Sequence, residues 1–529
     1  MGCDGLGSFR TYRTEAFPFY LREDTSMPLN RRQFLTTSAL GVTVASGSRV
    51  VGGSLSDASW RKRRLELAQR RRRIIYNDDG DARYKGYYGP APKDEAEFLK
   101  RRFNWTIDTQ IDSFFWCIGD GQEPPWGQPL PEGIDDCNTT MLGAARKAGQ
   151  EAVISMRMND IHDAFGTVNY PFKLKNRRML IEPTGAKGKY PSSDVRYYTW
   201  SALNYAFPEV REHKFAYLAK TCAKYVPDGL ELDFFRHPTF FKEGEEARNL
   251  PVMTEFVRRI RKRLDEIGKA RGKPILLIAR LADTPEKSVK MGLDGPTWLK
   301  ERLLDVLIVG GGYAPFWTAW TEYRDLAAKH DIPAYPCFNC SLASHFGRVE
   351  VMRGIASNWW HLGAAGVYLF NPFVPVDGKK IPAKTMYAEL NRLGDPKTLV
   401  GLDKVFCQDY FSDNSVLMQR MTADPPLPTA ISKTPKAIPL LVGDDLSKTP
   451  SDRRATCQLR LLTEPAQAPL TVKLNGQDIG TAKDNFQQFE VPPETIRHGN
   501  NKLIVASGDG QSTQLRRVQL WVRMKKGSS

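Results

Sequence analysis

Several common sequence signals are missing from this chain of 529 residues. No apolar run beyond its N-terminal segment is long enough to span a membrane, so we expect no membrane-spanning helix there. No zinc-finger, helix-turn-helix or RNA-binding signature accompanies the formal net charge of +16, which disfavours nucleic acid as a partner. No GxGxxG motif follows the first expected strand, which disfavours a dinucleotide-binding fold.

Cysteine is too sparse and too scattered to form a disulfide framework, with eight residues in the whole chain. Cys337 and Cys340 have the spacing of a redox or metal pair, but no second pair or histidine cluster completes a zinc site. Small apolar residues at a strand end are therefore the favoured interpretation. We expect no cofactor and no resident metal ion.

The N-terminus carries an export signal. The segment Asn30–Thr36, with its Arg31-Arg32 pair, resembles the twin-arginine motif. A weakly apolar run at 39–45 and small residues at 46–53 complete the layout of a signal peptide. We therefore expect residues 1–57 to be a signal region, Met27 to be the true start, and the mature protein to be periplasmic or secreted.

The length and composition indicate two globular domains. Hydrophobic residues make up 41% and charged residues 26% of the chain, as in folded rather than disordered proteins. Part of the positive charge lies in runs at 61–64 and 70–73 and at Lys525 and Lys526, which we expect to be solvated faces or linkers.

Residues 58–400 predict a (β/α)₈ barrel, because strand-like and helix-like patterns alternate there. The expected helices include 208–224, 252–270 and 349–361. The eight expected strands are 73–77, 111–116, 152–158, 229–234, 275–281, 306–309, 334–338 and 367–370.

Residues 401–529 predict a β-sandwich, since helical periodicity stops and short strands with turns follow. The expected strands are 458–462, 470–474, 486–491, 502–506 and 517–522, with Asn475-Gly476 as a hairpin turn and 425–450 as a loop-rich entry. The pattern, with Gly499–Leu503, resembles the jelly-roll, galactose-binding-like domains that are appended to many glycosidases.

The stretch Asp228–Pro238 is the most informative part of the chain. On a strand, Glu231 and Asp233 share one face, and Leu230 and Leu232 share the other. Burying carboxylates on such a strand is costly unless they are paired or used. We therefore interpret Asp233 as a catalytic carboxylate at the mouth of the barrel.

Polar residues follow nearly every expected barrel strand at its C-terminal end, where barrel enzymes place their sites. Glycoside hydrolysis needs a proton donor and a second carboxylate. Asp233 is the first choice for one of them, and Asp160, Asp283, Asp79 and Glu231 stay open as its partner. The candidates for substrate binding are Trp116, Arg157, Asn159, His162, Arg236, His237, Arg280, Tyr313, Asn339 and Asn371, and Trp317 could also stack on a sugar.

Two further hypotheses concern charge at this rim. Arg157 and Arg280 lie at comparable heights on neighbouring strands, so one or both are expected to pair with Glu231 and leave Asp233 available. Glu231→Gln should then harm folding more than Asp233→Asn. A divalent metal bound by Asp160, His162 and Asp163 is the less favoured alternative, because no third strand supplies a clear ligand set.

The segment Phe207–Arg211 and the stretch Asp228–Pro238 resemble the glycosyl-hydrolase-like family 10 barrels, with their "pEVR … DGi.lDy.ryP" pattern. Asp228, Gly229, Asp233, Arg236 and Pro238 match, while Glu231 departs from it. The strand also resembles the chitinase DGxDxDxE strand, but Phe235 replaces the catalytic glutamate of that motif.

The resemblance implies an exported (β/α)₈ hydrolase that acts on a polysaccharide or glycan, and a basic rim would suit an anionic one. Two alternatives stay open. One is a non-catalytic glycan-binding protein on a barrel scaffold, and the other is an exported, cofactor-carrying oxidoreductase. The sequence gives no indication of the oligomeric state.

Overall fold

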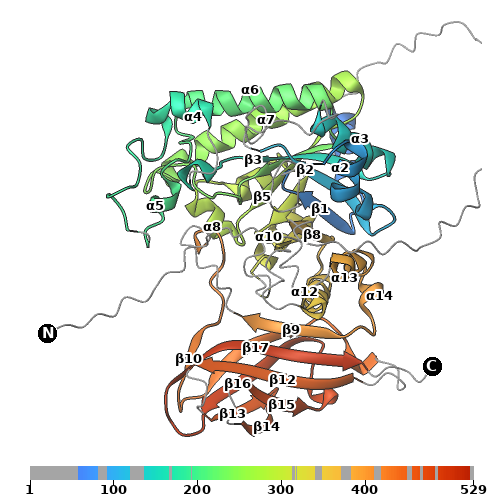
Figure 1. Cartoon of the computed structure of the whole chain (residues 1–529), viewed down its shortest axis with the longest axis vertical. Helices are drawn as coiled ribbons and strands as arrows, with labels where there is room; N and C mark the ends of the chain where they lie inside the picture. Colours follow the sequence, from blue (N-terminus) through green and yellow to red (C-terminus); the bar gives the residue numbers. More distant parts are fainter. Residues whose placement is uncertain are drawn as a thin grey trace, which may run out of the picture.

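The computed structural model describes residues 57–80, 92–119, 136–165, 170–191, 193–311, 316, 319–339, 348–370, 383–409, 419–448, 455–464, 469–482 and 486–524. A barrel surrounded by helices lies above a β-sandwich in Figure 1. The expected signal region up to residue 56, and the predicted site residues Tyr313, Trp317 and Asn371, lie outside the described residues.

The barrel is closed, with every neighbouring pair of strands parallel and β8 paired to β1, which confirms the predicted fold class. All eight strands lie within a residue or two of their predicted positions. They are β1 (Ile74–Asp78), β2 (Ile111–Cys117), β3 (Glu151–Arg157), β4 (Gly229–Asp233), β5 (Leu276–Leu281), β6 (Val306–Val309), β7 (Ala334–Asn339) and β8 (Val367–Phe370).

Helices fill the connections between the strands (Figure 1). The longest, α7 (Leu250–Arg271), buries one apolar stripe and ends at Gly272, whose φ of 75° suits a helix C-terminus. The others are α1 (Asp57–Ala68), α2 (Glu95–Arg102), α3 (Cys137–Lys147), α4 (Pro171–Lys175), α5 (Arg196–Thr199), α6 (Pro208–Tyr225), α8 (Pro285–Lys290), α9 (Gly295–Lys300), α10 (Thr321–Ala328), α12 (Val349–His361), α13 (Ala383–Ala388) and α14 (Pro396–Leu399). Among the described helices, none is apolar enough over a sufficient length to cross a membrane.

Two arginines of the basic runs are buried, which corrects the expectation that these runs are only solvated faces or linkers. Arg64 of α1 forms ion pairs with Asp265 and Asp305. Arg72 is fully buried, and its guanidinium donates to Glu151 at 2.7 and 2.8 Å. Both guanidinium groups are therefore paired with carboxylates at the N-terminal end of the barrel, where Arg261 shares Asp265 and Asp305 with Arg64.

The side chains of β4 point alternately to the core outside the barrel and to the barrel interior, as predicted for a strand. Leu230 and Leu232 pack into the core between the strands and the helices. Glu231 bonds to β1 and β8 on the far side of the barrel, so its side chain lies inside. Apolar side chains inside the barrel form one cluster, with Ile75, Phe115, Val153, Leu276, Ile278, Val306, Ile308, Tyr335, Cys337, Tyr368 and Phe370.

The C-terminal region is a β-sandwich of two antiparallel sheets, as predicted. The Asn475-Gly476 turn joins β13 to β14, with both residues at positive φ. The strands are β9 (Lys404–Asp409), β10 (Thr429–Ile431), β11 (Lys436–Val442), β12 (Ala455–Glu464), β13 (Leu470–Leu474), β14 (Gln477–Ala482), β15 (Phe486–Val491), β16 (Gly499–Ser507) and β17 (Thr513–Met524). The prediction of a loop-rich entry at 425–450 was wrong, since β10 and β11 lie there and pair with β17 and β16.

Helix α12 lies between the barrel and the sandwich and packs against the sandwich strands (Figure 1). The side-chain amide of Asn358 donates to the Leu441 carbonyl at 3.2 Å and accepts from the Gly443 N–H at 2.7 Å. Gly354 lies against the backbone of Val405, where a β-carbon would not fit. The sandwich is therefore held against the barrel by buried polar contacts and by close backbone packing.

Candidate active site

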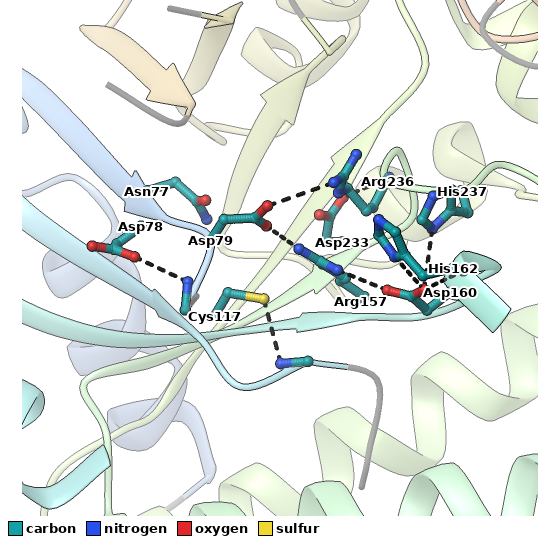
Figure 2. Close-up of polar contacts among 12 residues, drawn as sticks. Asn77, Asp78, Asp79, Cys117, Arg157, Asp160, His162, Asp233, Arg236 and His237 are labelled. Atoms are coloured by element: carbon teal, nitrogen blue, oxygen red, sulfur yellow. Dashed lines mark hydrogen bonds and ion pairs between the residues drawn. The ribbon is translucent and has the colours of Figure 1, made fainter. Parts of the chain in front are cut away.

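The C-terminal ends of β1, β3 and β4 bring a cluster of charged side chains together at the barrel mouth (Figure 2). Asp79 follows β1, Arg157 ends β3, and Arg236 follows β4. Parallel neighbouring strands end at the same rim, so residues about 80 positions apart in the chain become neighbours.

Arg157 is the centre of this cluster and is fully buried. Its guanidinium forms ion pairs with Asp79 and, at 2.7 Å, with Asp160. Burial alone would raise the pKa of Asp79, but the charges of Arg157 and Arg236 outweigh it and lower that pKa. Both carboxylates are therefore held in their ionised form.

His162 and His237 lie beside Asp160 (Figure 2). The Nδ1 of His162 is 2.6 Å from Oδ1 of Asp160, and the Nδ1 of His237 is 3.9 Å from the same oxygen. Burial holds the pKa of His237 well below its usual value. Burial alone would raise the pKa of Asp160, but the two histidines and Arg157 bring it well below its usual value.

Asp233 is paired with Arg280 of β5. The guanidinium donates to both carboxylate oxygens, at 2.9 and 2.7 Å, in a two-pronged geometry. The backbone N–H groups of Phe235 and Arg236 also donate to Asp233, at 3.0 and 3.1 Å. The predicted pairing of Glu231 with the arginines was therefore wrong: Arg280 holds Asp233, and Arg157 holds Asp79 and Asp160.

Glu231 lies at the floor of the site with neutral partners. The amide of Asn77 and the hydroxyl of Tyr368 donate to its carboxylate at 3.3 and 3.1 Å. Burial, followed by the negative charge of Asp233, raises the pKa of Glu231 to about 7. Arg280 bonds to Asp233 because both project inward from the ends of β4 and β5, which pair at this position.

Glu231→Gln should make stability less sensitive to pH. Because the folded-state pKa is raised, the folded protein retains a proton that the unfolded chain releases as pH rises from about 4.5 to 7. This costs the native protein about 3 kcal/mol above pH 7. Urea denaturation should show similar stability at pH 5 and a more stable variant at pH 8. A variant that is less stable than the unaltered protein at both pH values would contradict the conclusion that this site favours the protonated, neutral form of Glu231.

Three of the predicted site residues lie away from this cluster. Asp283 accepts a hydrogen bond from the Ala423 N–H at 3.0 Å and so fixes the segment that leads to the sandwich, and burial raises its pKa to about 7. Asn159 is buried, and its amide bonds to the backbone of Leu203 and Thr239. Both side chains hold loops in place through these hydrogen bonds, and their catalytic and binding roles stay predictions.

Trp116 is the third, with its ring buried in the core outside the barrel. Its indole N–H donates to Asn138 at 2.8 Å, and Arg102 lies over its face. It cannot stack on a substrate, which corrects the predicted binding role. Asn339 is at the buried end of β7.

Two other motifs have structural roles. Gly311, after β6, lies against the ring of Phe235, where a β-carbon would collide, so this glycine serves close packing. Cys337 faces Arg280 inside the barrel at 3.8 Å, and its partner in the predicted pair, Cys340, lies outside the described residues.

Sequence reasoning missed one residue of the site, Tyr368, and one contact, that of Asp78, which was named only as a polar residue at the end of the first strand. Tyr368 contributes the hydroxyl that bonds to Glu231, and its position between Val367 and Leu369 in a strand is the signal that could have found it. Asp78 pairs with Arg102 just outside the barrel, and burial raises its pKa to about 6. No motif marks that pair.

The expected metal ligand Asp163 is engaged elsewhere. It pairs with Lys173 at 2.9 Å and accepts a hydrogen bond from Ser201 at 2.9 Å. His237, from the loop after β4, takes its place beside Asp160 and His162. His237, which the sequence had connected only to substrate binding, therefore brings a second strand, β4, to this group.

No family model matches the chain, and no curated protein is similar to it. Among solved structures, an α-amylase from Geobacillus thermoleovorans complexed with acarbose is 10% identical, with a TM-score of 0.41 over 87% of this chain and 99% of the other. The PgaB (BpsB) glycoside hydrolase domain from Bordetella bronchiseptica is 13% identical, with a TM-score of 0.42 over 61% of this chain and 99% of the other. At this distance the matches assign neither an activity nor a substrate to this chain.

Proposed function

We propose that the chain is an exported glycoside hydrolase that acts on a polysaccharide or glycan by carboxylate catalysis at the C-terminal rim of the barrel. The observation that carries this proposal is the convergence of Asp79, Asp160 and Asp233 at the barrel mouth, each held by a buried arginine. A fold needs no such set for stability, because buried ion pairs are costly to form. Barrel enzymes place their catalytic groups at this rim.

Asp233 is the catalytic carboxylate in this proposal. Arg280 and two backbone N–H groups fix its orientation, so the carboxylate needs little reorganisation when a sugar binds. Asp79 and Asp160 have lowered pKa values, so neither suits the role of proton donor. Among the four carboxyls proposed as its partner, Glu231 shares the inner face of β4 and has a pKa of about 7, which suits a donor near neutral pH.

The test is a screen of the purified mature protein against neutral and anionic polysaccharides, read by the release of reducing ends. Turnover that is lost in Asp233→Asn supports the proposal. Turnover that survives in that variant contradicts the assignment of Asp233.

The second candidate is a non-catalytic glycan-binding protein on a barrel scaffold. One observation favours it: both oxygens of Asp233 already accept hydrogen bonds, from Arg280, Phe235 and Arg236, and the side chain is only 3% exposed. Binding of a polysaccharide without any release of reducing ends would support this candidate over hydrolysis.

A basic patch where the sandwich meets the start of α12 supports an anionic substrate. Arg348, Arg460 and Arg523 lie over the ring of Trp521, at 4.7, 4.3 and 5.1 Å from its centre. Burial, followed by the charges of Arg523 and Arg348, lowers the pKa of Arg460, so the three positive charges repel each other. A sulfate or carboxylate group would relieve that repulsion.

Arg460→Gln should therefore weaken binding to a sulfated polysaccharide several-fold at low salt and leave binding to a neutral one unchanged, because the lost contact is electrostatic. Affinity electrophoresis with each polysaccharide measures the difference. The matched control is Arg259→Gln, an arginine that also stacks on an aromatic ring, Phe215, but has its own carboxylate in Glu212. Equal losses of binding to the sulfated polysaccharide in both variants would show a nonspecific charge effect. That result would contradict a role of this patch in binding.

A further inference from the structure

Three side chains at the barrel mouth point toward one position (Figure 2). They are Asp160 from the loop after β3, His162 two residues later, and His237 from the loop after β4. One ligand atom of each lies within 4.8 Å of the others, and among the residues that the structure describes this is the one group with such an arrangement. Two imidazoles and one carboxylate are a common ligand set for divalent transition metals.

The ring of His237 provides an independent observation. This residue is 5% exposed, and its Nδ1 has no hydrogen-bond partner among the described residues. A buried nitrogen without a partner costs free energy comparable to a lost hydrogen bond, so its position needs an explanation. The Nδ1 faces Oδ1 of Asp160 at 3.9 Å, which is too long for a hydrogen bond.

The same distance suits two ligands of one ion. Bonds of about 2.0–2.1 Å to nitrogen and oxygen place two ligand atoms at most about 4.2 Å apart. The separation of 3.9 Å lies inside that limit, and the 2.6 Å between Asp160 and His162 would lengthen by roughly 0.7 Å, because tetrahedral ligands at these bond lengths lie about 3.3 Å apart. The two rings are edge to face with centres 4.9 Å apart, so each can turn its nitrogen inward without blocking the other.

The surroundings leave the required atoms available. Arg157 bonds to Oδ2 of Asp160 at 2.7 Å, and Oδ1, which also accepts from the backbone N–H of His162 at 2.9 Å, is the oxygen that faces the histidines. An outer partner of this kind orients a ligating carboxylate. Asp160 is fully buried and the side chain of His237 is 6% exposed, while that of His162 is 21% exposed, so the open side of the group faces solvent through His162.

We propose that Asp160, His162 and His237 form a binding site for a divalent transition-metal ion at the mouth of the barrel. The ion would have protein ligands on three sides, and its remaining positions would be open to water or to a sugar hydroxyl. The proposal is independent of glycoside hydrolysis, because it concerns binding and not turnover. It also departs from our expectation that the chain holds no resident metal.

The test uses the full chain after treatment with a chelator, with Zn²⁺ and Co²⁺ as probes. Equilibrium dialysis should give one ion per chain, and bound Co²⁺ should show the visible absorption of imidazole ligation. His237→Gln should weaken Co²⁺ binding by at least about 100-fold, which exceeds the loss expected from an outer-shell partner. Far-UV circular dichroism establishes that the variant is folded.

The matched control is His498→Gln, in a second histidine pair whose rings, those of His361 and His498, lie 4.3 Å apart. This variant should bind Co²⁺ as the unaltered chain does. Substoichiometric binding by the unaltered chain overturns the proposal whatever the variants do, as does equal binding by His237→Gln and the unaltered chain. Since no substrate is present, these results leave the glycosidase proposal untouched.

Discussion

Asp233→Asn is expected to lower the rate of glycan hydrolysis by about 10²–10⁴-fold, because a positioned catalytic carboxylate contributes a factor of that size. Asparagine is nearly the same size, and its carbonyl oxygen can still accept from the N–H groups of Phe235 and Arg236. The loop after β4 should therefore keep its shape. The loss of hydrolysis rate would then result from the missing negative charge of Asp233.

The same substitution removes the partner of a buried arginine. Arg280 is 1% exposed, and its positive charge would lack the carboxylate that it now contacts through two bonds. Breaking a buried pair costs about 3–5 kcal/mol, so the variant should also unfold at a lower temperature. Activity is best compared well below that temperature, with circular dichroism at the temperature of the assay.

The matched control is Asp283→Asn. Asp283 also follows a barrel strand, but it bonds to Ala423 and lies outside the charged cluster. Its pKa of about 7 means that a neutral side chain already suits this position near neutral pH. We expect hydrolysis within a few-fold of the unaltered protein, and equal losses in the two variants would contradict a catalytic role for Asp233.

Arg157→Gln is expected to give the largest loss of stability. One guanidinium serves Asp79 and Asp160 together, and all three groups are buried. Glutamine would leave Asp160 without any arginine and Asp79 with only the longer contact to Arg236, at 3.6 Å. The expected cost is at least about 3–5 kcal/mol, the range for breaking a single buried pair. Thermal unfolding followed by circular dichroism measures it.

Arg178→Gln is the control for that substitution. Arg178 pairs with Glu209 at 2.8 Å, but the two side chains are 65% and 49% exposed. Exposed pairs contribute little, so the melting temperature should hardly change. If both arginine variants unfold at the same temperature, the buried ion pairs of Arg157 contribute no more to stability than an exposed pair does, which would contradict the prediction.

Much of the fold could be predicted from the chain. The strand at 229–233 and the helix at 208–225 were found within a residue or two, because apolar periodicity and the flanking prolines and glycines act locally. The strands at 429–431 and 436–442 were missed, because prolines and lysines hide an edge strand whose partners are distant in sequence.

The grouping of these side chains at one rim could be predicted better than their contacts. Asp233, Asp160, Arg157 and the two histidines were all named as candidates, since each lies at or just after the C-terminal end of a barrel strand. The sequence could not show that Trp116 is a core residue and not one that stacks on a sugar. The order of residues does not say whether an aromatic side chain at the end of a strand faces the helices or the barrel mouth.

The sequence by itself determined that eight parallel strands would carry acids and arginines to one rim, because strand periodicity and chain order fix which ends meet. Only the tertiary structure decided the partners. Arg280 could have reached either acid of β4, and it bonds to Asp233 because the register of β4 and β5 places these two residues side by side. Glu231 is left with an amide and a hydroxyl, and burial without a positive charge of its own raises its pKa to about 7. An ion pair depends on distances of a few ångströms, and such distances exist only after the barrel has closed.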